Sequence, residues 1–135
     1  MPTPIYHTDE DLGEPISSYC HIARAGDFLF VAGTCGIGKD NKPVGSDIAA
    51  QTTAAYENVR LLLESQGATL RHVTKFITHL TDRADVPSFY AARERYFSEH
   101  FPTGEYPPNT LLIVNGLVWP ELKLEIDTWA YRPQD

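Results

Sequence analysis

The sequence has little sulfur and no long apolar segment. Its two cysteines, Cys20 and Cys35, are too few for the disulfide scaffold of a small secreted domain. No apolar run approaches the roughly 20 residues that cross a bilayer. Residues 1–15 lack the basic and apolar regions of a signal peptide. We therefore expect a cytoplasmic protein with free thiols and no membrane partner.

Basic residues are also scarce. The chain has 11 Lys and Arg against 18 Asp and Glu, a formal net charge of −7, and no Lys/Arg cluster. Nucleic-acid binding depends on such clusters to neutralise phosphates, so a nucleic-acid partner is disfavoured. The five histidines show no HExxH spacing and there is no CxxC pair, so no metal site is expected.

The length and composition of the chain predict one folded domain. The 135 residues contain 42% hydrophobic and 21% charged residues, which favours a packed core over disorder. Residues 1–15 are rich in proline and acid and are predicted to be a loose lead-in. No composition change or repeat divides the rest, so we expect a single domain over 1–135.

Apolar periodicity predicts two helices. The first begins after a cap at Ser46 or Asp47 and ends before Gly67, which suits a C-terminal glycine cap. Its apolar face carries Ile48, Thr52, Ala55, Val59, Leu62 and Leu63. Its opposite, polar face is predicted to carry Gln51, Glu57, Arg60 and Glu64. The second begins at a capping Asp85, with Pro87 in its first turn, and ends before Phe101.

Five segments are predicted to be strands: 18–25, 28–32, 73–80, 109–115 and 122–131. In the last segment, apolar residues alternate with Glu125, Asp127 and Trp129, so one face of the sheet is buried. The expected fold is α+β, a ββαβαββ mixed sheet with two helices on one face. The uncovered face is expected to meet another subunit or a ligand.

Three positions stand out chemically. Glu125 lies in the middle of a strand, where its carboxylate must face water, an interface or a site because unpaired burial is costly. The residues alone favour a solvated face over a site. Asn109-Thr110 is a turn or part of a site, and Cys35 is an inert small residue or a nucleophile with no evident base.

Several segments together resemble the Rid family, also called YjgF-like and formerly L-PSP endoribonuclease. The resemblance covers about Ser18 to Ala130, and its specificity lies in the order and spacing of the segments. They are Tyr19 with AGDFLFVAG at 25–33, Asp47-Ile48, Gln51-Thr52, Glu57-Asn58-Val59, Leu63-Glu64, Gly67-Ala68-Thr69-Leu70, Val73-Thr74-Lys75, Thr81-Asp82, Tyr96-Phe97, and Leu124-Glu125-Ile126-Asp127 with Ala130.

The resemblance implies a chorismate-mutase-like fold and a homotrimer with a central barrel. It also implies small-molecule sites in the clefts between subunits. The best-known members hydrolyse reactive enamines and imines to 2-oxo acids and ammonia without metal or cofactor. On that basis Glu125 is expected to handle water as the catalytic residue. Tyr19 and Gly33 match substrate-binding positions, and Asn109, Thr110 and Trp129 are further expected substrate contacts.

One departure limits this comparison. Where that subgroup has a carboxylate-binding arginine, this chain has Asn109, which lacks the charge and the guanidinium fork. Loss of such a charged contact costs on the order of 2–5 kcal/mol when the partner is buried. Arg24, Arg60 and Arg93 replace the charge only if the fold brings them to the cleft.

Two functions follow as expectations. The first is a divergent Rid-type hydrolase, acting on an enamine or imine other than the usual small 2-imino acids. The alternative is a non-catalytic trimer that binds a metabolite or regulates a partner. RNA cleavage, suggested only by the old family label, is disfavoured by the net charge of −7.

Overall fold

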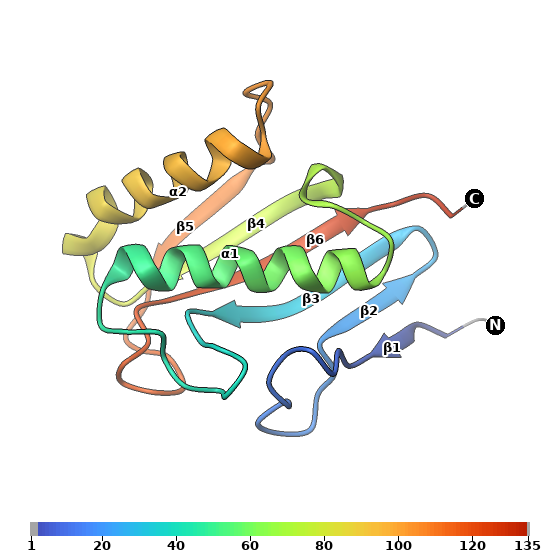
Figure 1. Ribbon diagram of the computed structural model, residues 1–135, viewed down its shortest axis with the longest axis horizontal. Helices are drawn as coiled ribbons and strands as arrows, with labels where there is room; N and C mark the ends of the chain where they lie inside the picture. Colours follow the sequence, from blue (N-terminus) through green and yellow to red (C-terminus); the bar gives the residue numbers. More distant parts are fainter. Residues whose placement is uncertain (1–2, 135) are drawn as a thin grey trace.

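The computed structural model describes residues 3–134, whose strands form one six-stranded sheet with two helices on one face (Figure 1). The strand order is β1-β2-β3-β6-β4-β5, antiparallel except for the parallel pair β4–β5. The elements are β1 (Ile5–His7), β2 (Ile22–Ala25), β3 (Phe28–Cys35), α1 (Ile48–Ser65), β4 (Val73–Leu80), α2 (Val86–His100), β5 (Asn109–Ile113) and β6 (Leu124–Tyr131). Short 3₁₀ turns at Leu70–His72 and Arg83–Asp85 precede β4 and α2. The predicted α+β fold is confirmed.

Local sequence signals explain where α1 begins and ends. Asp47 is the N-cap, and its carboxylate accepts a hydrogen bond from Ala49 N at 3.1 Å. Gly67 adopts a φ of 74° just past the C-terminus, a conformation that favours glycine. The predicted apolar face, from Ile48 to Leu63, is buried against the sheet.

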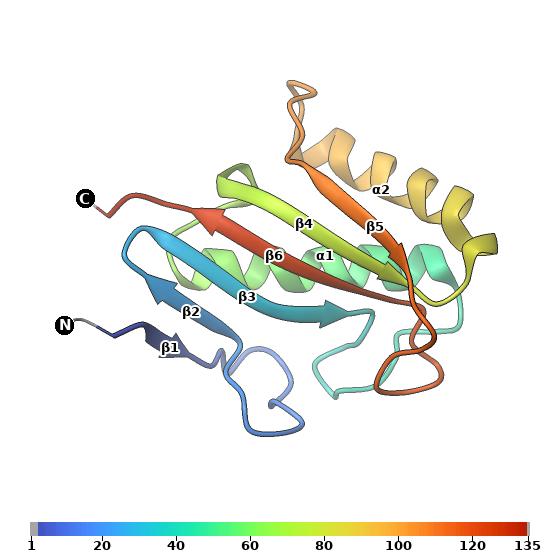
Figure 2. The same cartoon turned by 180° about the vertical axis from the view of Figure 1, so that it is seen from behind.

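Strand β6 is central and shows the predicted alternation. Leu124, Ile126, Thr128 and Ala130 are fully buried beneath the helices. The residues between them point to the opposite face, which no helix covers (Figure 2). Four exposed aromatic residues gather there in ring contact across β3 and β6: Phe28, Phe30, Trp129 and Tyr131.

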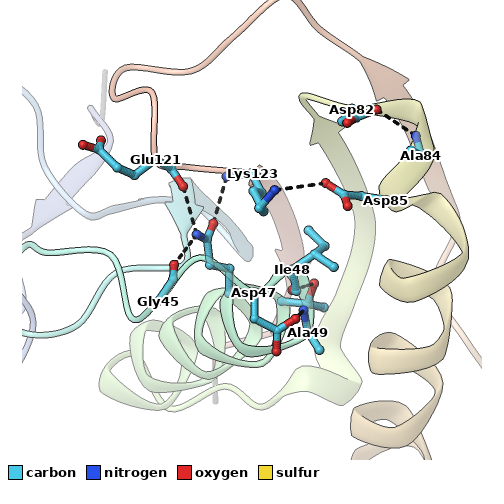
Figure 3. A network of polar contacts seen from close by, with 11 residues as sticks. Gly45, Asp47, Ile48, Ala49, Asp82, Ala84, Asp85, Glu121 and Lys123 are labelled. Carbon is cyan, nitrogen blue, oxygen red and sulfur yellow. Dashed lines mark hydrogen bonds and ion pairs between the residues drawn. The ribbon is translucent and has the colours of Figure 1, made fainter.

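Three local predictions are wrong. The predicted loose lead-in contains β1, which pairs with β2 through Ile5–His7. Gln51, predicted to be on the polar face of α1, is fully buried. Its amide donates to the carbonyls of Gly45 (2.7 Å) and Glu121 (3.0 Å), and its oxygen accepts from Lys123 N (2.8 Å; Figure 3).

Asp85 is the third. It occupies the N-cap position of α2 without a side-chain capping bond, and its carboxylate lies 3.6 Å from Lys123 Nζ instead (Figure 3). Strand limits also differ: β2 begins at Ile22, β5 ends at Ile113 and β6 begins at Leu124. Within residues 3–134, neither helix combines the length and apolar character that crossing a membrane requires.

Candidate active site

A cavity of about 450 Å³ opens beside the end of β3. Its inner wall comes from β3, α1 and β6, and its outer wall from residues 12–19 and 118–119. Three residues predicted from the sequence line it together: Tyr19, Gly33 and Glu125. The other contributors include Leu12, Glu14, Ile16, Ser17, His21, Thr34, Cys35, Ile37, Asn41, Asn58, Leu62, Val118 and Trp119.

Gly33 and Glu125 are in close contact. The register of β3 against β6 shifts between Val31 and Thr34, which marks an irregularity at Gly33. A Cβ atom at Gly33 would lie 2.8 Å from Glu125 Cδ and 3.1 Å from Cγ. Only glycine therefore allows the carboxylate to rest against the β3 backbone.

Glu125 is flanked by two reactive side chains from neighbouring strands. Cys35 of β3 and His79 of β4 are its direct cross-strand partners. Burial, then the nearby Asp127 carboxylate, raise the pKa of Glu125 above its usual range, opposed by His79 and a hydrogen bond from Cys35. His79 Nδ1 lies 3.1 Å from the Glu125 backbone carbonyl, so Nδ1 is the protonated nitrogen.

Cys35 is arranged as a proton donor rather than as a nucleophile. Burial and then the Glu125 carboxylate raise the pKa of its thiol to about 12. A thiol with that pKa remains protonated at neutral pH, whereas nucleophilic attack requires the thiolate. The raised pKa of the thiol favours the inert-residue alternative over the nucleophile.

The outer wall is fastened by two side chains that themselves line the cavity. His21 is buried, accepts from Asp9 N (3.0 Å) and donates from Nε2 to the Gly13 carbonyl (3.0 Å). Asn41 donates to the Glu14 carbonyl at 2.8 Å. These bonds hold residues 9–14 over the end of β3 and give the cavity a fixed outer boundary.

The other three predicted substrate contacts, Asn109, Thr110 and Trp129, lie outside the cavity lining. Asn109 Oδ1 accepts from Thr78 Oγ1 (2.7 Å), and Thr78 is fully buried on the helix-covered face. Thr110 accepts from Lys75 Nζ at 2.7 Å. Trp129 packs edge-on against Phe30, with ring centroids 6.2 Å apart. None of the three lines the described cavity, so their role in a site between subunits stays a prediction.

The arginines considered as replacements also lie away from the cavity. Arg24 donates to the Gln66 carbonyl at 3.0 Å. Arg60 pairs with Glu57 and Glu64 along α1, and Arg93 lies over aromatic rings of α2. No Lys or Arg is among the described residues that line the cavity. Among residues 3–134, no group of three His, Cys, Asp or Glu is placed to hold a metal ion.

Sequence reasoning missed most of the outer wall. Ile16, Val118 and Trp119 lie in loops without periodicity, so no pattern assigned them a common location. Val118 is 64% exposed, a property that only the structure reveals. His79 was missed because its partner, Glu125, is 46 residues away in the sequence.

Comparisons with known proteins identify the family of this chain. The family model described as Endoribonuclease L-PSP matches residues 10–132. The chain belongs to this family, the YjgF/Rid family. The family description does not by itself assign RNA cleavage to this member.

The similarity to curated relatives covers most of this chain. A RutC family protein of Pyrococcus horikoshii is 32% identical over 124 residues, covering 91% of this chain and 94% of that protein. The 3-aminoacrylate deaminase RutC of Acinetobacter baylyi is 30% identical over 118 residues, covering 87% and 89%. The family therefore includes a protein named as a deaminase.

Solved structures show the same fold. A probable translation initiation inhibitor from Rhodopseudomonas palustris has a TM-score of 0.85 at 26% identity, covering 98% of this chain and 100% of that one. The YjgF gene product from E. coli has a TM-score of 0.86 at 23% identity, covering 95% and 98%. The second likeness supports the fold alone.

Proposed function

We propose that this family member is a cofactor-independent hydrolase that deaminates a reactive enamine or imine. The observation that supports it is Glu125, a partly buried carboxylate held against the Gly33 backbone at the wall of a cavity. Membership of a family that includes a 3-aminoacrylate deaminase agrees with this chemistry. Groups with raised pKa values in cavities are frequent sites of proton transfer.

In the proposed mechanism, the substrate reacts as its iminium ion, and Glu125 accepts a proton from water while the water oxygen adds to the iminium carbon. The protonated carboxyl then transfers that proton to the amino nitrogen of the carbinolamine. The C–N bond breaks as the Glu125 carboxylate takes the hydroxyl proton and passes it to the departing ammonia, so that ammonium and a carbonyl compound leave. An enamine substrate is first protonated at carbon, which gives the iminium ion. The raised pKa of Glu125 makes its protonated carboxyl available as the donor of that proton.

The usual small 2-imino acids are poor candidates for the substrate. Their carboxylate needs a cation, and the described cavity lining contains no Lys or Arg. The side chain at the family's arginine position, Asn109, is neutral and bonded to Thr78. We expect turnover of 2-iminopropanoate to be weak or absent.

We further propose that the protein is a homotrimer, with the uncovered sheet face turned inward. The four exposed aromatic residues on that face support this arrangement, since a patch of this kind is unfavourable in water. In such an assembly we expect Asn109, Thr110 and Trp129 to contribute to the sites between subunits.

Imine hydrolysis tests the proposed function. An amino-acid oxidase supplies imines with small, aromatic and acidic side chains, and ammonia release is measured above the uncatalysed rate. Glu125→Gln should lose at least about 100-fold in rate. The control is Glu121→Gln, since the Glu121 side chain is exposed and only its backbone carbonyl is bonded.

If no imine is hydrolysed, including those without a carboxylate, the hydrolase proposal is wrong. The non-catalytic binding protein then becomes the better description. If Glu125→Gln keeps the wild-type rate, hydrolysis occurs by another route, and Glu125 is not the catalytic residue.

A further inference from the structure

The polar side chains of the cavity are mostly occupied by the protein itself. His21 uses both ring nitrogens, and Asn41 donates to Glu14 O. Asn58 Nδ2 donates to the carbonyls of Cys35 (3.2 Å) and Ile37 (3.1 Å). Thr34 Oγ1 donates to Ala55 O at 3.1 Å. The donor and acceptor positions used in these bonds shape the cavity and are not available to a ligand.

The groups that remain available are acceptors and neutral hydroxyls. They include the Glu125 and Glu14 carboxylates and the hydroxyls of Ser17 and Tyr19. Tyr19 Oη accepts a long bond from Ile16 N (3.4 Å) and keeps its proton for a ligand. Within one chain, a negatively charged ligand meets two carboxylates in the lining and no described Lys or Arg. A ligand with N–H donors or a positive charge meets a matching partner in Glu125.

The rest of the lining is apolar. Hydrocarbon or aromatic surface comes from residues that include Leu12, Ile16, Ile37, Leu62, Val118 and Trp119. The cavity volume of about 450 Å³ is in the range of small-molecule sites. It accommodates a single ring or a branched chain beside one polar group.

We propose that the substrate is an apolar imine or iminium ion without a carboxylate, a class that rests on the hydrolase function proposed above. The nitrogen lies at Glu125, and an aryl or branched alkyl group fills the space between Ile16, Val118 and Trp119. The reaction is R–CH=NH₂⁺ + H₂O → R–CHO + NH₄⁺. Oxidation of a primary amine is the class of reaction that supplies such an imine.

A matched pair of substrates tests this class. Benzylamine with an amine oxidase and phenylglycine with an amino-acid oxidase give imines that differ only in the carboxylate. We expect kcat/KM to be at least about tenfold higher for the imine from benzylamine. Equal or faster hydrolysis of the imine from phenylglycine would overturn the proposal while leaving the hydrolase function in place.

Calorimetric binding separates the ligand class from the chemistry. Benzylamine should bind at least about tenfold more tightly than benzoate, and Glu125→Gln should weaken benzylamine alone. If benzylamine binds selectively but no imine is hydrolysed, the hydrolase function fails and the ligand class remains. If benzoate binds as tightly as benzylamine, the ligand class is wrong.

A charge introduced at the cavity provides a second test. Val118→Arg places a cation at the outer wall and should raise the affinity for benzoate at least about fivefold. The control is Leu61→Arg, which adds the same charge on the exposed side of α1, outside the cavity lining. Equal effects of the two variants would overturn the assignment of Val118 to the ligand site.

Discussion

At the scale of single residues, the site depends on the absence of a side chain at Gly33. The absence of a Cβ atom lets the Glu125 carboxylate lie against the backbone of β3, next to Cys35. The sequence allowed Gly33 and Glu125 to be predicted as site residues because the family resemblance included both positions. It did not show that they touch, since that contact spans two strands and a register shift.

Gly33→Ala should lower the rate of imine hydrolysis by about 100-fold, because a misplacement of about 1 Å has that effect on a catalytic group. The added methyl group would lie 2.8 Å from Glu125 Cδ and displace it. Gly116→Ala is the control, since its Cβ would have no neighbour within 4 Å. Steady-state kinetics on both variants measure the effect; wild-type activity in Gly33→Ala would contradict the contact.

The pH dependence of activity should reflect the raised pKa of Glu125. The base must be ionised, so the acidic limb of kcat/KM is expected above the ordinary glutamate value of about 4.3. His79 opposes the rise, so His79→Gln should move that limb to still higher pH. A limb that stays in place in His79→Gln would exclude this electrostatic role.

The same carboxylate should reduce stability. Because the pKa of Glu125 is raised in the folded state, its ionised carboxylate destabilises the fold. This loss of stability is fully present above the folded-state pKa and disappears as the pH falls through it. Glu125→Gln should therefore have a higher Tm than wild type at pH 7, and the difference should vanish at pH 4. Thermal unfolding at both pH values measures this, and a lower Tm at pH 7 would contradict it.

At the scale of elements, periodicity predicted what faces the core but not what is buried at the ends of elements. The limits of β4 and the burial of Ile48 and Leu63 followed from local pattern. Gln51 did not, because its hydrogen-bond partners belong to a loop before α1 and to the segment before β6. Strand β1 was missed because three residues beside prolines carry too little periodic signal.

Gln51→Leu should destabilise the protein by about 2–4 kcal/mol, because the fully buried Gln51 amide makes three part-buried hydrogen bonds, to Gly45, Glu121 and Lys123, that leucine cannot make. Gln66→Leu is the matched control, since that side chain bonds only to the neighbouring Ser65 carbonyl. It should change stability by less than about 0.5 kcal/mol. Urea unfolding compares the two variants, and similar midpoints would contradict a structural role for Gln51.

At the scale of the whole molecule, the uncovered sheet face predicts self-association. Light scattering should give three times the chain mass of 15.1 kDa. Phe30→Lys, which places a charge among the exposed aromatic residues, should shift the population toward single chains. Leu61→Lys on the outer side of α1 is the control. A wild-type mass of one chain would contradict the trimer.

The position of β6 has a consequence for synthesis. This strand follows the other described strands in the sequence, yet it lies between β3 and β4 and is hydrogen-bonded to both (Figure 2). Until the ribosome has released β6, the nascent chain holds two separate half-sheets with exposed strand edges, which are prone to aggregation. The sheet, and the Gly33–Glu125 contact with it, is therefore completed only once β6 has left the ribosome.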